Sequence, residues 1–216
     1  MPTPPADMQY LVIEGNIGAG KTTLATMLAE EHGARLVLER FADNPFLPKF
    51  YANAERYGFP LELSFLAERY QQLNADIREG SLFHPLTVAD YFFMKSLIFA
   101  QNTLRGDELK LYQQIFHIMH GTLPRPDLYV YLHLPPERLL QNIHRRGRHY
   151  EQRIEQEYLE RIAHGYFNFF KQHPEHTILI IDTQNIDFVA NPHDYLKIKN
   201  IIFGTKYPQG IHRVLA

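Results

Sequence analysis

Short apolar segments rich in β-branched and aromatic residues alternate along this chain with longer segments of helical periodicity. Because helical sequence separates consecutive apolar segments, the connections are crossovers and the strands are expected to be parallel. The pattern therefore predicts an α/β fold in which helices cover both faces of a five-stranded parallel sheet. The predicted strands are Tyr10–Gly15, Ala34–Glu39, Leu86–Tyr91, Leu128–Leu134 and Thr177–Asp182.

A glycine-rich turn joins the first predicted strand to the first predicted helix. It reads GNIGAGKT and fits the pattern GxxxxGK[ST], in the strand–loop–helix context that this pattern requires. In such a loop, successive backbone N–H groups converge on phosphate oxygens at the start of a helix. We therefore predict a nucleoside triphosphate site, with Lys21 on the β- and γ-phosphates and Thr22 as a Mg²⁺ ligand. The residues expected to hold the phosphates are Gly15, Asn16, Ile17, Gly18, Ala19, Gly20, Lys21, Thr22 and Thr23.

Composition limits the class of protein. The 216 residues, 45% of them hydrophobic, are enough for one domain over residues 1–216, with residues 1–8 expected to form a loose tail. A net charge of −2 gives no sign of nucleic-acid binding, and the lack of cysteine excludes disulfides and thiolate chemistry. The sequence shows neither a signal peptide nor an apolar run long enough to span a membrane. We expect a soluble cytoplasmic protein.

Two carboxylates follow predicted strands at the edge where ligands of parallel sheets bind. Glu39 ends the second strand and Asp90 lies at the end of the third. Opposite the phosphate-binding loop, Glu39 could accept the proton of an attacking hydroxyl as a general base. The alternative is a surface glutamate paired with Arg40, which is the more common situation for an isolated residue of this kind.

Two other charged groups are candidates for the same cleft. Glu62 and Arg69 lie seven residues apart on a predicted helix, so both can line one groove, although a solvated stripe is the alternative. Arg145, Arg146 and Arg148 surround a glycine between two predicted helices. A basic loop of this kind could close over transferring phosphates, and a merely solvated loop is the alternative.

Together these segments resemble the deoxynucleoside kinase family, P-loop enzymes that transfer the γ-phosphoryl group of ATP to the 5′-hydroxyl of a deoxyribonucleoside. The similarity runs from about Gln9 to Lys199 and is carried by IEGNIGAGKTT, by LER followed by DNPFLPKFY, by RRGRHYEQ and by IDTQNIDF. It implies a three-layer P-loop kinase fold with an arginine lid, and ATP with Mg²⁺ as the phosphate donor.

The resemblance also implies roles for individual residues. Glu39 matches the catalytic glutamate, and Asp90 matches a carboxylate that shares the metal with Thr22. The remaining matches place Tyr51 and Glu151 on the deoxyribose 3′-hydroxyl, Glu62 and Arg69 on the base, Arg146 and Arg148 on the phosphates, and Asp187 and Phe188 beside the adenine of ATP.

The segment TVADYFFMKS departs from the family pattern. When it is aligned on the acid-Arg-Ser motif, Asp90 takes the place of the acid and Tyr91 that of the arginine. Ser96 stands where an acid usually pairs with the base-contacting arginine. Lys95 and Arg145 are the candidates for the missing cation, and the sequence does not choose between them.

The base and the reaction leave alternatives open. Arg69 supplies hydrogen-bond donors and an ionised Glu62 supplies acceptors, which together favour a purine over thymine. A nucleoside monophosphate kinase is one alternative, although Glu39 beside the acceptor would repel a second phosphate. A non-catalytic nucleotide-binding switch is the other, although it needs neither Glu39 nor the lid arginines.

Two strongly apolar helical segments, at residues 91–104 and 109–123, exceed what one sheet face needs. An apolar face that pairs two copies is therefore expected, and the family resemblance implies the same homodimer. His117 and His120 lie three residues apart in the second segment. A zinc site there is disfavoured because neither HExxH nor cysteine is present.

Overall fold

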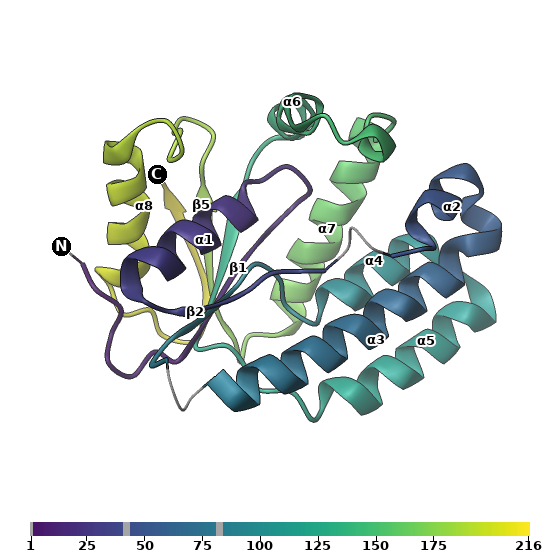
Figure 1. Ribbon diagram of the computed structural model, residues 1–216, viewed down its shortest axis with the longest axis horizontal. Helices are drawn as coiled ribbons and strands as arrows, with labels where there is room; N and C mark the ends of the chain where they lie inside the picture. Colours follow the sequence, from purple (N-terminus) through teal and green to yellow (C-terminus); the bar gives the residue numbers. More distant parts are fainter. Residues whose placement is uncertain (1, 41–43, 81–83) are drawn as a thin grey trace.

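Six parallel strands form one sheet, in the order β2-β3-β1-β4-β5-β6 (Figure 1). The computed structural model describes residues 2–40, 44–80 and 84–216. The strands are β1 (Tyr10–Gly15), β2 (Arg35–Val37), β3 (Thr87–Ala89), β4 (Leu128–His133), β5 (Thr177–Asp182) and β6 (Gly210–Leu215).

Helices connect the strands and form the layers on either side of the sheet. The longest of the described helices is α3, which contains Pro60. The helices are α1 (Lys21–His32), α2 (Leu47–Ala52), α3 (Ala54–Gly80), α4 (Lys95–Thr103), α5 (Gly106–His120), α6 (Pro136–Arg146), η1 (His149–Glu151), α7 (Gln156–Gln172) and α8 (Pro192–Phe203).

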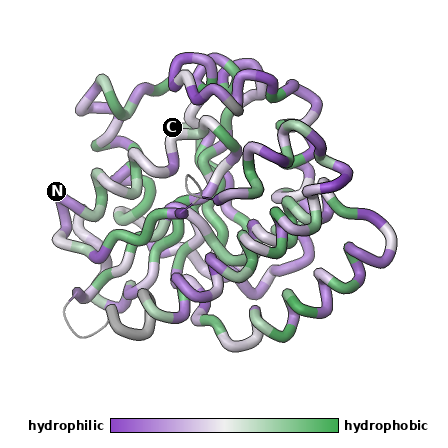
Figure 2. Tube along the Cα trace, turned by 45° about the vertical axis from the view of Figure 1, so that its right-hand side comes forward, coloured by the Kyte–Doolittle hydropathy of each residue, from purple (hydrophilic) through white to green (hydrophobic). Residues whose placement is uncertain are grey.

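The two faces of the sheet bury alternate side chains of the same strands. On β1, Leu11 and Ile13 belong to a cluster shared with α1, α6 and α8, whereas Tyr10 and Val12 belong to one shared with α3, α4, α5 and α7. The alternation follows from the period of two along a strand. Figure 2 shows the apolar residues gathered along the central strands, and Figure 1 shows α3, α4 and α5 running side by side. The predicted three-layer α/β fold is confirmed.

The prediction of five strands was one short. β6 pairs in parallel with β5, from Thr177 opposite Gly210 to Asp182 opposite Leu215. Its sequence, GIHRVL, places a histidine and an arginine among four apolar or small residues, and its side chains alternate between half-buried and exposed. A strand at the edge of a sheet buries little apolar surface, so hydrophobic patterning gives it a weak signal.

β2 and β3 are shorter than the segments predicted for them. The chain leaves the sheet after Val37 and Ala89, and the backbone N–H of Glu39 donates to Asp90 Oδ1 over 2.7 Å. Both carboxylates therefore lie just beyond the strand ends, at the edge where the phosphate-binding loop begins. Phe41–Asp43 of the segment that follows Glu39 lie outside the described residues.

The last residues of the expected tail contact the rest of the domain. Lys206 Nζ lies 2.6 Å from Asp7 Oδ2, and Met8 packs against the core cluster of the α1 face, so the end of the expected tail is attached to the domain.

Among the residues described, the helices lack the combination of length and apolar content that is needed to cross a bilayer.

Candidate functional site

The phosphate-binding loop depends on glycines for both conformation and space. Gly18 and Gly20 have φ values of +83° and +88°, which side chains rarely allow. A Cβ on Gly18 would lie 2.8 Å from the carbonyl oxygen of Leu139 on α6, and one on Gly20 would lie 2.9 Å from Cζ of Phe188. The glycines thus let α6 and the loop after β5 approach the phosphate-binding loop closely.

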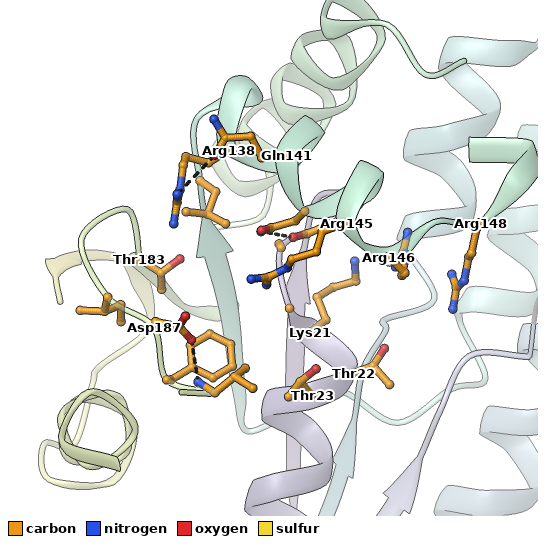
Figure 3. A pocket seen from close by; sticks show the side chains of 18 residues that line it. Lys21, Thr22, Thr23, Arg138, Gln141, Arg145, Arg146, Arg148, Thr183 and Asp187 are labelled. Atoms are coloured by element: carbon orange, nitrogen blue, oxygen red, sulfur yellow. Dashed lines mark hydrogen bonds between the residues drawn. The ribbon is translucent and has the colours of Figure 1, made fainter. Parts of the chain in front are cut away.

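A cavity of about 590 Å³ opens above this loop. Figure 3 shows Lys21 pointing from the start of α1 toward Arg145 and Arg146, with Thr183 and Asp187 on the opposite side. The cavity is polar and strongly basic, as a polyphosphate site requires. Its lining is Gly18, Ala19, Gly20, Lys21, Thr22, Thr23, Leu134, Arg138, Gln141, Asn142, Arg145, Arg146, Arg148, Thr183, Ile186, Asp187, Phe188 and Val189.

Lys21 is held within the loop that it serves. Its Nζ donates to the backbone oxygen of Asn16 over 2.9 Å. Burial, together with the nearby charge of Lys95, lowers the pKa of Lys21 to about 8. At neutral pH, Lys21 is therefore still protonated in most molecules. A phosphate arriving beside it would favour the charged form further.

Thr22 and Asp90, the predicted metal ligands, lie side by side. Thr22 Oγ1 donates to Asp90 Oδ2 over 2.5 Å, and Asp90 is buried. A hydroxyl and a carboxylate side by side at the start of α1 are the hard oxygen ligands that suit Mg²⁺. The donor set therefore fits the ion that the sequence predicts.

The loop after β5 closes the far side of the cavity. Asp187 Oδ1 accepts from the backbone N–H groups of Val189 and Ala190 over 3.1 and 3.0 Å, which fixes the turn. Phe188 is buried and its ring covers Gly20. On α6, Asn142 Nδ2 donates to the backbone oxygen of Gly18 over 2.9 Å, and so attaches that helix to the loop.

A second cavity, of about 140 Å³, adjoins the first. The two cavities share Gly18, Lys21, Thr22, Arg146 and Arg148. The second is lined by Ile17, Gly18, Lys21, Thr22, Glu39, Leu47, Phe50, Tyr51, Leu61, Glu62, Phe65, Arg69, Asp90, Lys95, Phe99, Arg146, Arg148, Glu151 and Tyr158. The structure thus brings together all of the predicted catalytic and substrate-binding residues.

Glu39 lies between two cations in this cavity. Lys95 Nζ is 2.5 Å from its Oε2, and Nη2 of Arg69 is 2.6 Å from its Oε1. Burial by itself would raise the pKa of Glu39, but the charges of Lys95 and Arg69 and their hydrogen bonds outweigh it and hold the pKa at about 2. The carboxylate is therefore ionised throughout the physiological range.

Arg69 is bound to protein groups as well as facing the cavity. Its Nε also donates to Glu39 Oε1, over 2.9 Å, and its Nη1 donates to Ser96 Oγ over 2.9 Å. Ser96 thus supplies one partner where the family resemblance expects an acid. Most of the hydrogen-bonding capacity of Arg69 is directed at Glu39 and Ser96, which leaves less of it for a base than the sequence suggests.

Lys95, and not Tyr91, supplies the cation beside Glu39. Tyr91 is fully buried and its hydroxyl donates to Gln72 Oε1 over 3.0 Å. Lys95 begins α4, four residues further along the chain. Of the two candidates in the sequence, Arg145 lines the larger cavity instead.

Glu62 is almost completely buried at the wall of the second cavity. Its Oε1 accepts from the hydroxyl of Thr103 on α4 over 2.8 Å. Burial raises the pKa of Glu62 to about 7, against the opposing effects of the Thr103 hydrogen bond and the charge of Arg69. Thr103 could not be recognised as a partner of Glu62 from the sequence, because the two residues lie 41 positions apart.

The sugar-binding candidates line the same cavity. Glu151 forms ion pairs with Arg146 and, over 3.3 Å, with Nη1 of Arg148. Tyr51 on α2 is 36% exposed and lines the cavity together with Glu151. Glu151, one of the two predicted sugar ligands, is thus already in contact with the lid arginines.

Two groups of residues, one in the site and one in the core beneath it, were missed from the sequence. The apolar walls include Phe50, Phe65 and Phe99, whose helical spacing resembles that of ordinary core residues. Glu14 in β1 is fully buried and accepts from the backbone N–H of Phe92 and, over 2.9 Å, from the hydroxyl of Tyr166. A carboxylate within an apolar strand was the available signal for this link between β1, the segment before α4, and α7.

Comparison with known proteins gives one consistent result. The family model described as deoxynucleoside kinase matches residues 11–205. A deoxyguanosine kinase of Bacillus subtilis is 40% identical over 193 residues, which cover 88% of this chain and 93% of that protein. A deoxyadenosine/deoxycytidine kinase of the same organism is 30% identical over 200 residues, which cover 89% of each. The structure of an M. mycoides deoxyadenosine kinase with bound dATP superimposes with a TM-score of 0.76 at 21% identity, covering 90% of this chain and 99% of that one. The chain therefore belongs to the deoxynucleoside kinase family.

Proposed function

We propose that this deoxynucleoside kinase uses ATP with Mg²⁺ to phosphorylate the 5′-hydroxyl of a purine deoxynucleoside. The observation that carries the proposal is the pair of adjoining cavities, which share Gly18, Lys21, Thr22, Arg146 and Arg148. The larger has the volume of a nucleotide site, and the smaller is lined by the residues that the sequence predicts for the nucleoside. The shared residues are those that can stabilise a phosphoryl group as it passes from one to the other.

On the donor side, the loop and Lys21 bind the phosphates, and Phe188 and Asp187 bound the space for the adenine. Thr22 and Asp90 would hold Mg²⁺, whose chemistry is to neutralise charge on the donor phosphates. Arg146 and Arg148 face both cavities, so they can neutralise the charge of the phosphoryl group in the transition state.

On the acceptor side, Glu39 receives the proton of the 5′-hydroxyl while the 5′-oxygen bonds to the γ-phosphorus. The bond between that phosphorus and the bridging oxygen breaks, and ADP leaves. A pKa of about 2 makes Glu39 a weak base. In a loose transition state the hydroxyl keeps its proton until late, so orientation of the hydroxyl matters more than base strength.

The acceptor pocket supports a deoxynucleoside of the purine class. Tyr51 and Glu151 line this cavity and would bond the 3′-hydroxyl, while Phe65 and Phe99 would offer apolar surface to a base. Arg69 and Glu62 present donors and acceptors on one side of α3. The 40% identical relative is named a deoxyguanosine kinase, which favours the same class.

The proposal is tested by incubating the protein with ATP, Mg²⁺ and each of the four deoxynucleosides at equal concentration. We expect 5′-monophosphate from deoxyguanosine or deoxyadenosine at a higher kcat/KM than from thymidine. Lys21→Ala should abolish turnover without unfolding, because this side chain points into the cavity. A clear preference for thymidine, or full activity of the Lys21→Ala variant, would contradict the proposal.

We also propose a homodimer formed through α5. This helix leaves Leu111 48% and Ile118 76% exposed, two turns apart on one side. Placing both residues in a subunit contact would remove apolar surface from water. Light scattering after size-exclusion chromatography should give twice the mass of the 25.4 kDa chain, and Ile118→Asp should give the monomer. A monomeric parent protein would exclude the dimer.

A further inference from the structure

We infer that Glu62 is the specificity-determining residue of the acceptor pocket: in its ionised form it accepts hydrogen bonds from N1–H and the 2-amino group of guanine, and so favours deoxyguanosine over deoxyadenosine. The inference deepens the proposed function and depends on it for the identity of the pocket. It concerns one side chain whose protonation state decides which purine edge it can match.

Among the residues that the structure describes, Glu62 is the carboxylate lining this cavity whose charge remains available to a ligand. The other three have charged or metal-site partners: Glu39 is bound by two cations, Glu151 by the lid arginines, and Asp90 by Thr22. Glu62 accepts from the neutral hydroxyl of Thr103. Each carboxylate oxygen has two acceptor sites, so both oxygens can still receive a hydrogen bond from a base.

The position of Glu62 suits a base better than a phosphate. Glu62 lines the smaller cavity and is absent from the lining of the larger one. Leu61 and Phe65, its neighbours on α3, and Phe99 on α4 provide apolar surface around it. A flat base between such walls would present its polar edge to the carboxylate of Glu62.

The two purines differ in the groups that they would present to Glu62. Guanine offers two adjacent donors, N1–H and the 2-amino group, which match the two acceptors of a carboxylate. Adenine offers a donor, the 6-amino group, next to an acceptor, N1. An ionised carboxylate has no donor for N1, so adenine would be left with an unpaired acceptor in a buried site. A protonated Glu62 could donate to N1 and accept from the 6-amino group.

The surroundings of Glu62 place its titration in the neutral range. Burial is the main reason that the pKa rises to about 7. Arg69 opposes this rise, and Glu39, itself neutralised by Lys95, adds to it. The groups that face Glu62 from the other helices are Thr103 on α4, Tyr112 on α5 and Tyr158 on α7. Burial raises the pKa of both tyrosines, so they remain neutral and do not titrate with Glu62.

The test compares kcat/KM for deoxyguanosine, deoxyadenosine and deoxyinosine, which lacks the 2-amino group, at about pH 6 and about pH 8. We expect the parent protein to prefer deoxyguanosine over deoxyadenosine by roughly 10- to 100-fold at the higher pH, the range for one bidentate base contact. Because protonation converts Glu62 to the adenine-compatible form, the ratio should fall about tenfold or more at the lower pH. Deoxyinosine should fall between the two purines at the higher pH.

Glu62→Gln keeps the size of the side chain and replaces the charge with one donor and one acceptor. We expect this variant to lower the preference for deoxyguanosine about tenfold and to make the ratio independent of pH. Glu55→Gln is the matched control, because Glu55 is an exposed residue at the start of the same helix. Its ratios should equal those of the parent protein.

Three results would overturn the inference: equal ratios in the parent protein and the Glu62→Gln variant, a ratio that rises as the pH falls, or equal kcat/KM for deoxyinosine and deoxyguanosine. Lack of turnover with every deoxynucleoside would instead refute the proposed function. In that case calorimetric binding of deoxyguanosine to the parent protein and to the Glu62→Gln variant still tests the contact. If Glu62 contacts guanine, the variant should bind deoxyguanosine about tenfold more weakly than the parent protein. If it does not, the two proteins should bind deoxyguanosine equally.

Discussion

Lys95 Nζ lies 2.5 Å from Oε2 of Glu39, and both side chains are about nine-tenths buried. With Arg69 on the other carboxylate oxygen, two cations flank one anion at the wall of the acceptor cavity. This arrangement explains why the pKa of Glu39 is low in spite of its burial. It also gives Lys95 a role that its place in the sequence left open.

The first prediction concerns Lys95. Lys95→Met removes the cation and keeps the length of the side chain, so the orientation of Glu39 should be lost and its pKa should rise. We expect kcat to fall roughly 10²- to 10³-fold, as for the loss of one preorganised electrostatic contact, and the acid limb of the kcat–pH profile to move to higher pH. Lys95→Arg should retain most of the activity. If the activity of the Lys95→Met variant stayed within about threefold of the parent protein, Lys95 would have no role in catalysis.

A second prediction tests Glu39 as the acceptor of the proton. Glu39→Gln should lower kcat by roughly 10²- to 10⁴-fold, the range for a lost general base, while the Kd for the deoxynucleoside stays near that of the parent. The Kd is measured by calorimetry without ATP. If kcat changed by less than about threefold, another group would have to receive the proton.

The same carboxylate should contribute to stability in a pH-dependent way. Its pKa of about 2 lies below the ordinary value of 4.5, so the unfolded state binds the proton more tightly than the folded state. The stabilisation, about 3 kcal/mol for a shift of this size, is complete above about pH 4.5 and is lost as the pH falls toward 2. Glu39→Gln should therefore be less stable at neutral pH, and the gap should close in acid. A gap in the free energy of unfolding that is independent of pH would contradict this account.

Gly20→Ala tests the contact between the phosphate-binding loop and Phe188. The new Cβ would meet Phe188 at 2.9 Å in addition to the backbone strain at φ +88°. Gly33→Ala is the control, because Gly33 also has a positive φ, +59°, but has no atom within 4 Å of the new Cβ. Both variants should lose about 1 kcal/mol of stability. Gly20→Ala should in addition weaken ATP binding severalfold. Equal ATP affinity in the two variants would show that the contact between Gly20 and the ring of Phe188 is not needed for ATP binding.

Recognition of the 3′-hydroxyl can be tested with a 2′,3′-dideoxynucleoside. If Tyr51 and Glu151 both bond this hydroxyl, its removal leaves buried polar groups unpaired and should cost about 1–3 kcal/mol for each. The measurement is the ratio of kcat/KM for the deoxy and dideoxy forms. Tyr51→Phe should reduce that ratio, because one of the two contacts is already lost in the variant. A ratio near one in the parent protein would exclude both contacts.

Much of the fold could be predicted from the sequence because its central elements are strongly apolar. β1, β4 and β5 are buried on both faces, and the predicted segments for them agree with the structure within one residue. β6 escaped prediction because it lies at the edge of the sheet, where its side chains alternate and half of them stay exposed. The ends of β2 and β3 were placed too late, because Leu38 and Tyr91 continue the apolar pattern after the chain has left the sheet at Val37 and Ala89.

The candidate site could be predicted in its composition but less well in its internal contacts. The phosphate-binding loop is specified by local sequence, since its glycines and Lys21 act within a few residues of one another. The pairing of Glu39 with Arg69 and Lys95 joins residues 30 and 56 positions apart, and periodicity carries no information on such distances. A signal for Lys95 did exist, because a lysine within the apolar run YFFMKSLIFA has to be buried or to reach a partner.

Lys95 stands five residues after Asp90, whereas the acid-Arg-Ser pattern puts its cation one residue after the acid. An alignment read column by column records this difference as a loss, although in space a positive charge still reaches Glu39. We therefore expect the two solutions to exclude one another among related chains, because an arginine at position 91 together with Lys95 and Arg69 would set three cations against one carboxylate. Sequence searches for such kinases should therefore accept a cation at either position. Comparisons of related sequences should treat Lys95 as a positive charge that has moved from position 91 to position 95.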